Sequence, residues 1–148
     1  MKKLTLALGL AAALVSSQSV LADGQETIKV YKSPSCGCCG DWVDHLKENG
    51  FEVDVTDMDN MNQVKMDAGL TRQLASCHTA FVGDYVIEGH VPASDIQRLL
   101  AESPQGHGLS VPGMPMGSPG MEYGDRKDTY QVLLFNKEGQ TRVFAEHN

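Results

Sequence analysis

The chain has 148 residues, of which 41% are hydrophobic and 21% charged, and its formal net charge is −7 at pH 7. This length supports one hydrophobic core of ordinary size and argues against two domains. The acidic charge argues against nucleic acid as a partner, because binding to phosphates requires a basic surface.

The first 22 residues have the features of an export signal. Lys2 and Lys3 form a charged start, residues 4–15 are an apolar run too short to span a bilayer, and small residues precede a cut after Ala22. We therefore predict a signal peptide over residues 1–22 and one periplasmic domain over residues 23–148, with no membrane span in the mature chain. Outside the cytoplasm an accessible thiol pair tends to be oxidised unless something holds it reduced.

The first half of the mature chain predicts a βαβ unit followed by a helix. Residues 27–32 and 51–55 alternate apolar and polar side chains, as strands do, and residues 39–49 carry apolar side chains at helical spacing. A crossover of this length makes the two strands parallel. Residues 58–68 predict a second helix, with Met58, Met61 and Met66 on its core face.

The second half predicts a hairpin, a helix and a further hairpin. Residues 79–89 form two short apolar runs around Gly83-Asp84, and Ser94 with Gln97 three residues later reads as the cap of a helix. Residues 103–126, rich in Gly, Pro and Met, predict a long loop, and residues 128–135 and 141–145 a C-terminal hairpin. The fold class is α/β: a thioredoxin-like domain with a Met/Gly/Pro-rich loop and an added C-terminal β-hairpin.

This topology brings three distant segments to one edge of the sheet. Residues 36–39 follow the first strand, Cys77 and His78 precede the third, and residues 88–90 end the fourth. We therefore expect Cys77 to face the three cysteines of the CGCC motif.

The CGCC motif offers more sulfur than a redox pair needs. Cys36 and Cys39 have the CxxC spacing of a dithiol at a helix N-terminus, which favours thiolates. A bond between Cys38 and Cys39 would be strained, because neighbouring Cα atoms lie closer than disulfides prefer. With Cys77 opposite, the cluster suits a soft metal: zinc, iron–sulfur or Cu⁺. Adjacent thiolates favour bridging, and hence several Cu⁺ ions.

Methionines and histidines extend the candidate metal site. Met114, Met116 and Met121 lie in the loop segment PGMPMGSPGME, and thioether sulfur is a soft ligand suited to Cu⁺. Flexible methionines that fill apolar gaps are the plainer interpretation. Of the five histidines, only His78 and His90 fall at the sheet edge with the cysteines, where hydrogen bonding and ligation are equally good interpretations. We predict that His45 is an ordinary surface or boundary residue, and we assign His107 and His147, in loop and tail, no role beyond surface metal contact.

With these residues identified, the chain resembles the CopG-like family of exported copper-resistance proteins. The resemblance rests on CGCC followed by Trp42, on residues 76–93 and on residues 111–122, in that order. It implies a thioredoxin-like fold and a copper site of Cys36, Cys38, Cys39 and Cys77, with His90, Met114 and Met121 in motif positions nearby.

Three functions from different classes are consistent with these patterns. The first is a periplasmic protein that holds Cu⁺ for copper resistance, with copper ions and other periplasmic copper-handling or redox proteins as partners. Cycling between Cu⁺ and Cu²⁺ would make it a copper oxidoreductase. The second is a thiol–disulfide oxidoreductase with Cys36 as nucleophile and Cys39 as resolving thiol. The third is a structural zinc or iron–sulfur module.

Overall fold

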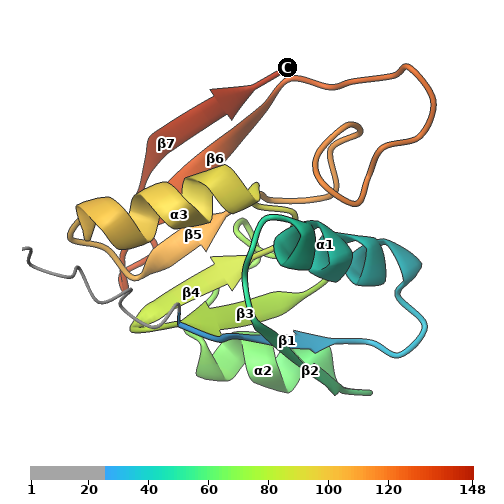
Figure 1. The fold of residues 1–148 in the computed structure, drawn as a ribbon. Helices are drawn as coiled ribbons and strands as arrows, with labels where there is room; N and C mark the ends of the chain where they lie inside the picture. Colours follow the sequence, from blue (N-terminus) through green and yellow to red (C-terminus); the bar gives the residue numbers. More distant parts are fainter. Residues whose placement is uncertain (1–25) are drawn as a thin grey trace, which may run out of the picture.

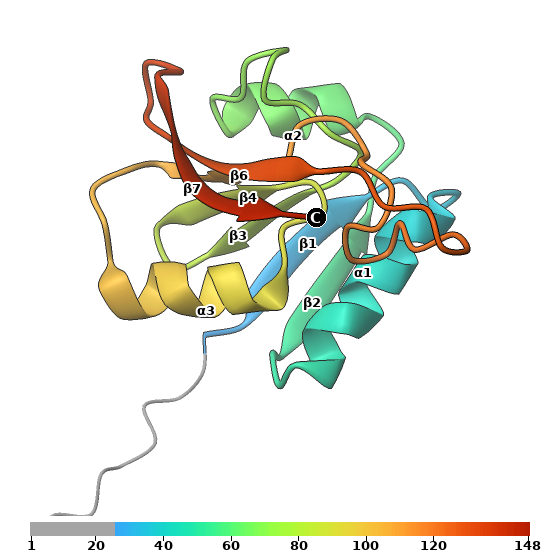
Figure 2. The same ribbon diagram turned by 90° about the horizontal axis from the view of Figure 1, so that it is seen from above.

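The computed structural model describes residues 26–148. They form a seven-stranded sheet of order β2-β1-β3-β4-β5-β6-β7. Helices α1 and α3 cover one face of this sheet and α2 lies on the other (Figures 1 and 2). The elements are β1 (Ile28–Lys32), α1 (Gly37–Glu48), β2 (Val53–Asp57), α2 (Met61–Asp67), β3 (Thr79–Val82), β4 (Tyr85–Glu88), α3 (Ala93–Glu102), β5 (Gly108–Ser110), β6 (Tyr130–Phe135) and β7 (Thr141–His147). The predicted α/β thioredoxin-like class is confirmed.

The βαβ unit forms as the hydrophobic pattern predicts. Strands β1 and β2 pair in parallel, and Ile28 and Val30 of β1 are buried. Helix α1 turns Trp42, Val43 and Leu46 into the same core, so its apolar stripe covers the β1 side of the sheet. Because β1 ends where α1 begins, the CGCC motif occupies the strand-to-helix turn.

The predicted hairpin also forms, since β3 and β4 pair antiparallel on either side of Gly83-Asp84. Gly83 has φ +53°, in the left-handed region that such tight turns favour. Strand β1 pairs with β3, so the ends of β1 and β4 and the start of β3 lie at one edge.

The predicted loop over residues 103–126 is interrupted by a strand, so this prediction was too simple. Strand β5 pairs in parallel with β4 and antiparallel with β6, and it joins the C-terminal hairpin to the sheet. Three residues are too few to show an alternating pattern. The pairing with β4 requires glycine at position 108, because a Cβ there would run into the carbonyl of Val86.

The predicted core role of the α2 methionines was wrong. No residue of α2 is buried, and Met66 is 64% exposed. The sheet offers little apolar surface to this helix, because β2 is largely exposed. A small second core on this face is instead made by Ala68 and Leu74, which follow the helix and pack with Val86 and Phe135.

The predicted cap of α3 was also wrong, because the helix begins at Ala93, one residue before Ser94, with Pro92 at the cap position. No side chain of the cap residue bonds to the helix. Instead the Ala93 amide donates to Nε2 of His45, 3.1 Å away, from α1. His45 is a half-buried boundary residue that also joins the two helices, and burial lowers its pKa despite Glu122 and Glu48 nearby.

We expect a His45→Ala variant to lose about 1–2 kcal/mol of unfolding free energy at pH 8, because the Ala93 amide loses its acceptor. A lowered pKa in the folded state means that the folded protein disfavours the proton. This part of the stability is therefore complete above pH 6.5 and is lost as pH falls through the lowered pKa. Urea unfolding between pH 5 and 8 should show a shallower pH slope in the variant than in the wild type. An unchanged slope would contradict this role, and Lys47→Ala on the same helix is the control.

The predicted signal peptide and its cleavage site lie outside the described residues. Within residues 26–148, no helix has both the length and the apolar character needed to cross a membrane.

Candidate metal and thiol site

The CGCC turn carries a disulfide between Cys36 and Cys39, with 5.4 Å between their Cα atoms. Cys36 stands at the cap position of α1, and Cys39 in the first turn is fully buried. Cys38 stays a free thiol, with its Sγ 3.6 Å from Sγ of Cys36. The CxxC pair is thus the bonded one, and a four-thiolate site requires prior reduction of this bond.

Cys77 comes to the same place from the segment before β3. The Sγ atoms of the four cysteines all lie within 4.8 Å of one another. This closeness follows from the topology, because β1 and β3 are adjacent and their site ends meet at one edge. Ligation of a metal by these four residues stays a prediction.

The thiol of Cys77 is protonated at neutral pH. Burial is the main cause and the neighbouring Cys38 the next, and together they raise the pKa of Cys77 to about 11. Unlike Cys36 and Cys39, Cys77 lies outside the first turn of a helix, where thiolates are favoured. Any metal bound by Cys77 must therefore displace a proton.

His90 is fully buried beside Cys77 with its ring orientation set by the backbone. Its Nδ1 lies 2.8 Å from the carbonyl oxygen of Pro119, so Nδ1 carries the proton and donates it. Its Nε2 then has a free lone pair, 3.1 Å from Sγ of Cys77. Burial lowers the pKa of His90, which keeps the ring neutral. A neutral imidazole held by a carbonyl is the usual form of a metal-binding histidine.

His78 lies on the other side of Cys77, with Nδ1 3.3 Å from the sulfur. The ring is fully buried, with its centroid 4.3 Å from that of Trp42 and 4.8 Å from that of His90. Within residues 26–148 its Nε2 has no hydrogen-bond partner, although the Gly89 backbone lies by the ring and opposes the fall of its pKa. Burial lowers the pKa of His78 well below its usual value, so this ring is neutral.

The Met-rich loop contacts the site through its second half. Met121 is 8% exposed and follows Gly120, which lies against the first turns of α1, whereas Met114 is 52% exposed. Figure 1 shows this loop folded beside the start of α1. The structure therefore buries Met121 and leaves Met114 at the surface, and ligation by either stays a prediction.

Gly120 sets how closely this loop approaches the CGCC turn. Its φ is +84°, and a Cβ there would lie 2.7 Å from the carbonyl oxygen of Cys38 and 2.8 Å from the amide of Trp42. We expect Gly120→Ala to lower the free energy of unfolding by about 2–4 kcal/mol, combining backbone strain with overpacking. Gly113→Ala is the matched control, because Gly113 has φ +72° but open space around it, and it should cost only about 1 kcal/mol. Equal losses in thermal or denaturant unfolding would show that the close contact is unimportant.

A buried ion pair behind Cys77 was missed from the sequence. Glu88 is fully buried and accepts from Nζ of Lys65 at 2.5 Å, from Oγ1 of Thr79 at 2.6 Å and from the amide of Ser76 at 2.6 Å. Burial raises the pKa of Glu88, although Lys65 opposes the shift. The bond to Ser76 anchors the residue just before Cys77. The one signal in the sequence was an acidic residue that ends the apolar run of β4.

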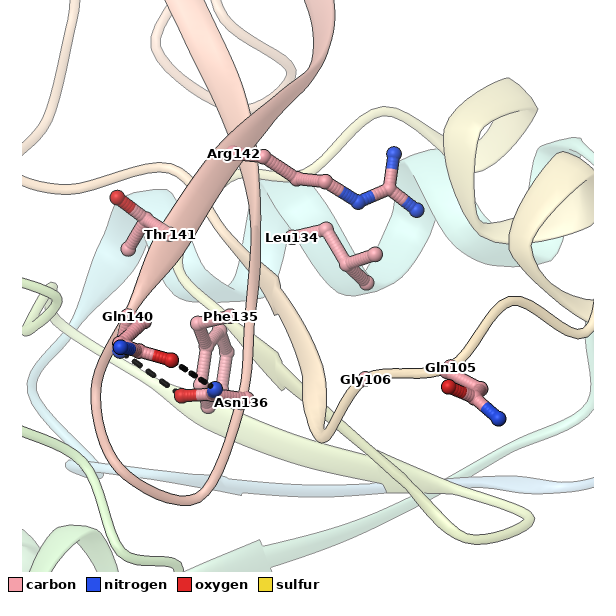
Figure 3. A pocket seen from close by; sticks show the side chains of 8 residues that line it. All are labelled: Gln105, Gly106, Leu134, Phe135, Asn136, Gln140, Thr141 and Arg142. Atoms are coloured by element: carbon pink, nitrogen blue, oxygen red, sulfur yellow. Dashed lines mark hydrogen bonds between the residues drawn. The ribbon is translucent and has the colours of Figure 1, made fainter.

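A separate hollow of about 180 Å³ lies where β6 turns into β7, away from the cysteines (Figure 3). Its polar groups bond to each other. The side-chain Nδ2 of Asn136 donates to Oε1 of Gln140, and the backbone amide of Gln140 donates to Oδ1 of Asn136, both at 2.8 Å. These polar groups are used to close the turn. The hollow therefore offers fewer free donors and acceptors than the cysteine site.

Together, the fold and the site define a thioredoxin-like thiol protein with four clustered sulfurs and two buried neutral imidazoles. The family model described as "protein of unknown function, DUF411" matches residues 74–121, which contain Cys77, both imidazoles and the Met-rich segment. No curated protein matched the chain.

Two solved structures cover most of the chain. One, described as copper resistance protein CopG, Form 2, has 44% identity and a TM-score of 0.79, and the match covers 84% of this chain and 99% of that one. Form 1 of the same protein has 46% identity and a TM-score of 0.78, with 83% and 98% covered. The chain belongs to the CopG family of copper-resistance proteins.

Proposed function

We propose that this protein binds Cu⁺ through Cys36, Cys38, Cys39 and Cys77 and acts in copper resistance. The observation that carries this proposal is that the Sγ atoms of the four cysteines lie within 4.8 Å of one another. The solved relatives, described as copper resistance proteins, support copper as the metal. Thiolates are the donors that Cu⁺ prefers.

The disulfide makes the copper site dependent on redox state. Reduction of the Cys36–Cys39 bond takes two electrons and two protons and leaves four thiols. Four thiolates this close can be shared between ions, so we propose a multinuclear Cu⁺ cluster. His90 would add a neutral nitrogen, and Met121 and Met114 would add thioethers that cover or feed the cluster.

Anaerobic titration of the fully reduced protein tests this function. With a competing Cu⁺ chelator, we expect more than one Cu⁺ per chain to bind, and X-ray absorption should show mainly sulfur neighbours. A stoichiometry of zero would contradict the proposal. Zinc or an iron–sulfur cluster in protein purified from copper-supplemented cells would favour a structural module instead.

We also propose that the domain over residues 23–148 works in the periplasm after removal of residues 1–22. The support is the charged, apolar and small-residue pattern of the N-terminus. Mass spectrometry of the exported protein should show a chain that begins at Asp23. An intact N-terminus in the periplasmic fraction would contradict cleavage.

The Cys36–Cys39 disulfide supports a second candidate function, thiol–disulfide exchange. A CxxC disulfide at a helix N-terminus is the arrangement of thioredoxin-like oxidoreductases. In that function Cys36 would attack or be attacked first and Cys39 would resolve the mixed disulfide. By the same exchange chemistry, a periplasmic dithiol protein would reduce this disulfide before copper binds. Transfer of electrons from the reduced cysteines to copper would make the present protein a copper oxidoreductase.

A further inference from the structure

We propose a second metal site in this protein, formed by Cys77, His78 and His90, that binds a borderline divalent ion while the Cys36–Cys39 disulfide is closed. Each of these three residues offers one ligand atom, and the three atoms lie within 4.8 Å of one another. His78 has no role in the copper site proposed above. The two sites share Cys77 and His90, but this proposal does not depend on binding of Cu⁺.

The three side chains already have the spacing of a metal site. Sγ of Cys77 lies 3.3 Å from Nδ1 of His78 and 3.1 Å from Nε2 of His90. In a tetrahedral zinc site, bonds of 2.3 Å to sulfur and 2.0–2.1 Å to nitrogen separate these atoms by about 3.6 Å. The two sulfur–nitrogen distances therefore need to lengthen by only a few tenths of an ångström.

The surroundings of His78 favour a ligand rather than a core residue. The ring is fully buried and its Nδ1 contacts the sulfur of Cys77, while Nε2 has no hydrogen-bond partner within residues 26–148, although the Gly89 backbone lies by the ring. Burying a nitrogen without a partner is costly, and such groups in folded proteins need an explanation. The Trp42 ring packs against the ring of His78 at an interplanar angle of 33°.

His90 completes the set because its other nitrogen is occupied. The carbonyl of Pro119 accepts a hydrogen bond from Nδ1–H, which leaves the Nε2 lone pair facing Cys77. This carbonyl comes from the Met-rich loop, so the loop orients the ligand without itself binding the ion.

The oxidation state of the CxxC pair selects between the two donor sets. With the disulfide closed, Cys36 and Cys39 are not thiolates, and the remaining donors are the two imidazoles and the free thiols of Cys77 and Cys38. Such a set suits borderline ions of the Cu²⁺ and Zn²⁺ class, whereas four thiolates suit Cu⁺. Cys77 belongs to both donor sets. Reduction of the disulfide therefore changes the metal preference around Cys77 from divalent ions to Cu⁺.

Cobalt binding to a Cys38→Ser variant with the disulfide intact tests the site. This variant has one free thiol, Cys77, so a second disulfide within the chain and ligation by two thiolates are excluded. We expect one Co²⁺ per chain, with a sulfur-to-cobalt charge-transfer band and X-ray absorption showing one sulfur and two imidazoles. Adding His78→Phe should weaken Co²⁺ binding by at least about tenfold and remove one imidazole. His147→Gln, which changes an imidazole on β7, is the control and should leave the affinity unchanged.

Two results would overturn the proposal. One is the absence of a charge-transfer band in the Cys38→Ser protein, and the other is unchanged Co²⁺ affinity after His78→Phe. If His78→Phe does not fold, the X-ray absorption of the Cys38→Ser protein decides, because fewer than two imidazoles contradicts the site. Failure of Cu⁺ binding in reduced wild-type protein would refute the proposed function and leave these cobalt results standing.

Discussion

A Cys77→Ser variant should lose tight Cu⁺ binding while it keeps the Cys36–Cys39 disulfide. Cys77 is the one sulfur of the cluster that comes from outside the CGCC turn, and a neutral hydroxyl is a poor ligand for a soft ion. We expect the affinity of the reduced protein for Cu⁺ to fall by more than about a hundredfold, since loss of an outer-shell partner alone costs 10–100-fold. Competition with a Cu⁺ chelator under anaerobic conditions measures this.

The same variant separates the two candidate functions. A thiol–disulfide oxidoreductase needs Cys36 and Cys39, so Cys77→Ser and Cys38→Ser should both keep exchange activity, whereas the copper function loses metal in both. Ser35→Ala, an exposed change in the same turn, is the control for copper binding. Retention of full Cu⁺ stoichiometry by Cys77→Ser would contradict the four-sulfur site and leave the dithiol function as the better explanation.

A Lys65→Met variant should lose about 3–5 kcal/mol of unfolding free energy at pH 7, because it leaves the buried carboxylate of Glu88 without its cation. Nζ of Lys65 lies 2.5 Å from that carboxylate, and the side chains of Lys65 and Glu88 are 13% and 0% exposed. Lys47→Met is the matched control. Its pair with Asp44 is exposed and 3.9 Å apart, and its loss should cost less than about 1 kcal/mol.

The pH dependence of this loss follows from the pKa of Glu88. Burial raises that pKa in the folded state and Lys65 lowers it, so removal of Lys65 lets the folded protein hold the proton to a higher pH. A raised pKa means stability that is complete at low pH and lost as pH rises through the folded value. The cost of Lys65→Met should therefore be smaller at pH 5 than at pH 7 in urea unfolding. An equal cost at both values would show that Glu88 does not respond to Lys65.

Most of the fold was predictable from local patterns, and the failures have physical causes. The alternation in β1 and the helical spacing in α1 are properties of short segments, so both elements form as expected. Helix α2 shows helical spacing too, yet its methionines stay partly or largely exposed, because burial depends on the apolar surface that the sheet presents. Strand β5 is held by neighbours on both sides rather than by its own three residues.

The candidate site divides in the same way. Spacing placed Cys36, Cys38 and Cys39 on one turn, and the order of the strands brought Cys77 and His90 to it. The pairing of Cys36 with Cys39, the high pKa of Cys77 and the unpartnered nitrogen of His78 depend on which groups surround each atom.

By itself, the sequence determined the thioredoxin-like order of elements and the gathering of soft donors at one sheet edge, because residue spacing and strand order are written along the chain. Only the tertiary structure decided which sulfurs are bonded, which nitrogens are free and which carboxylate lies buried behind them. Those properties arise from desolvation and from contacts between residues distant in sequence, which no local pattern records.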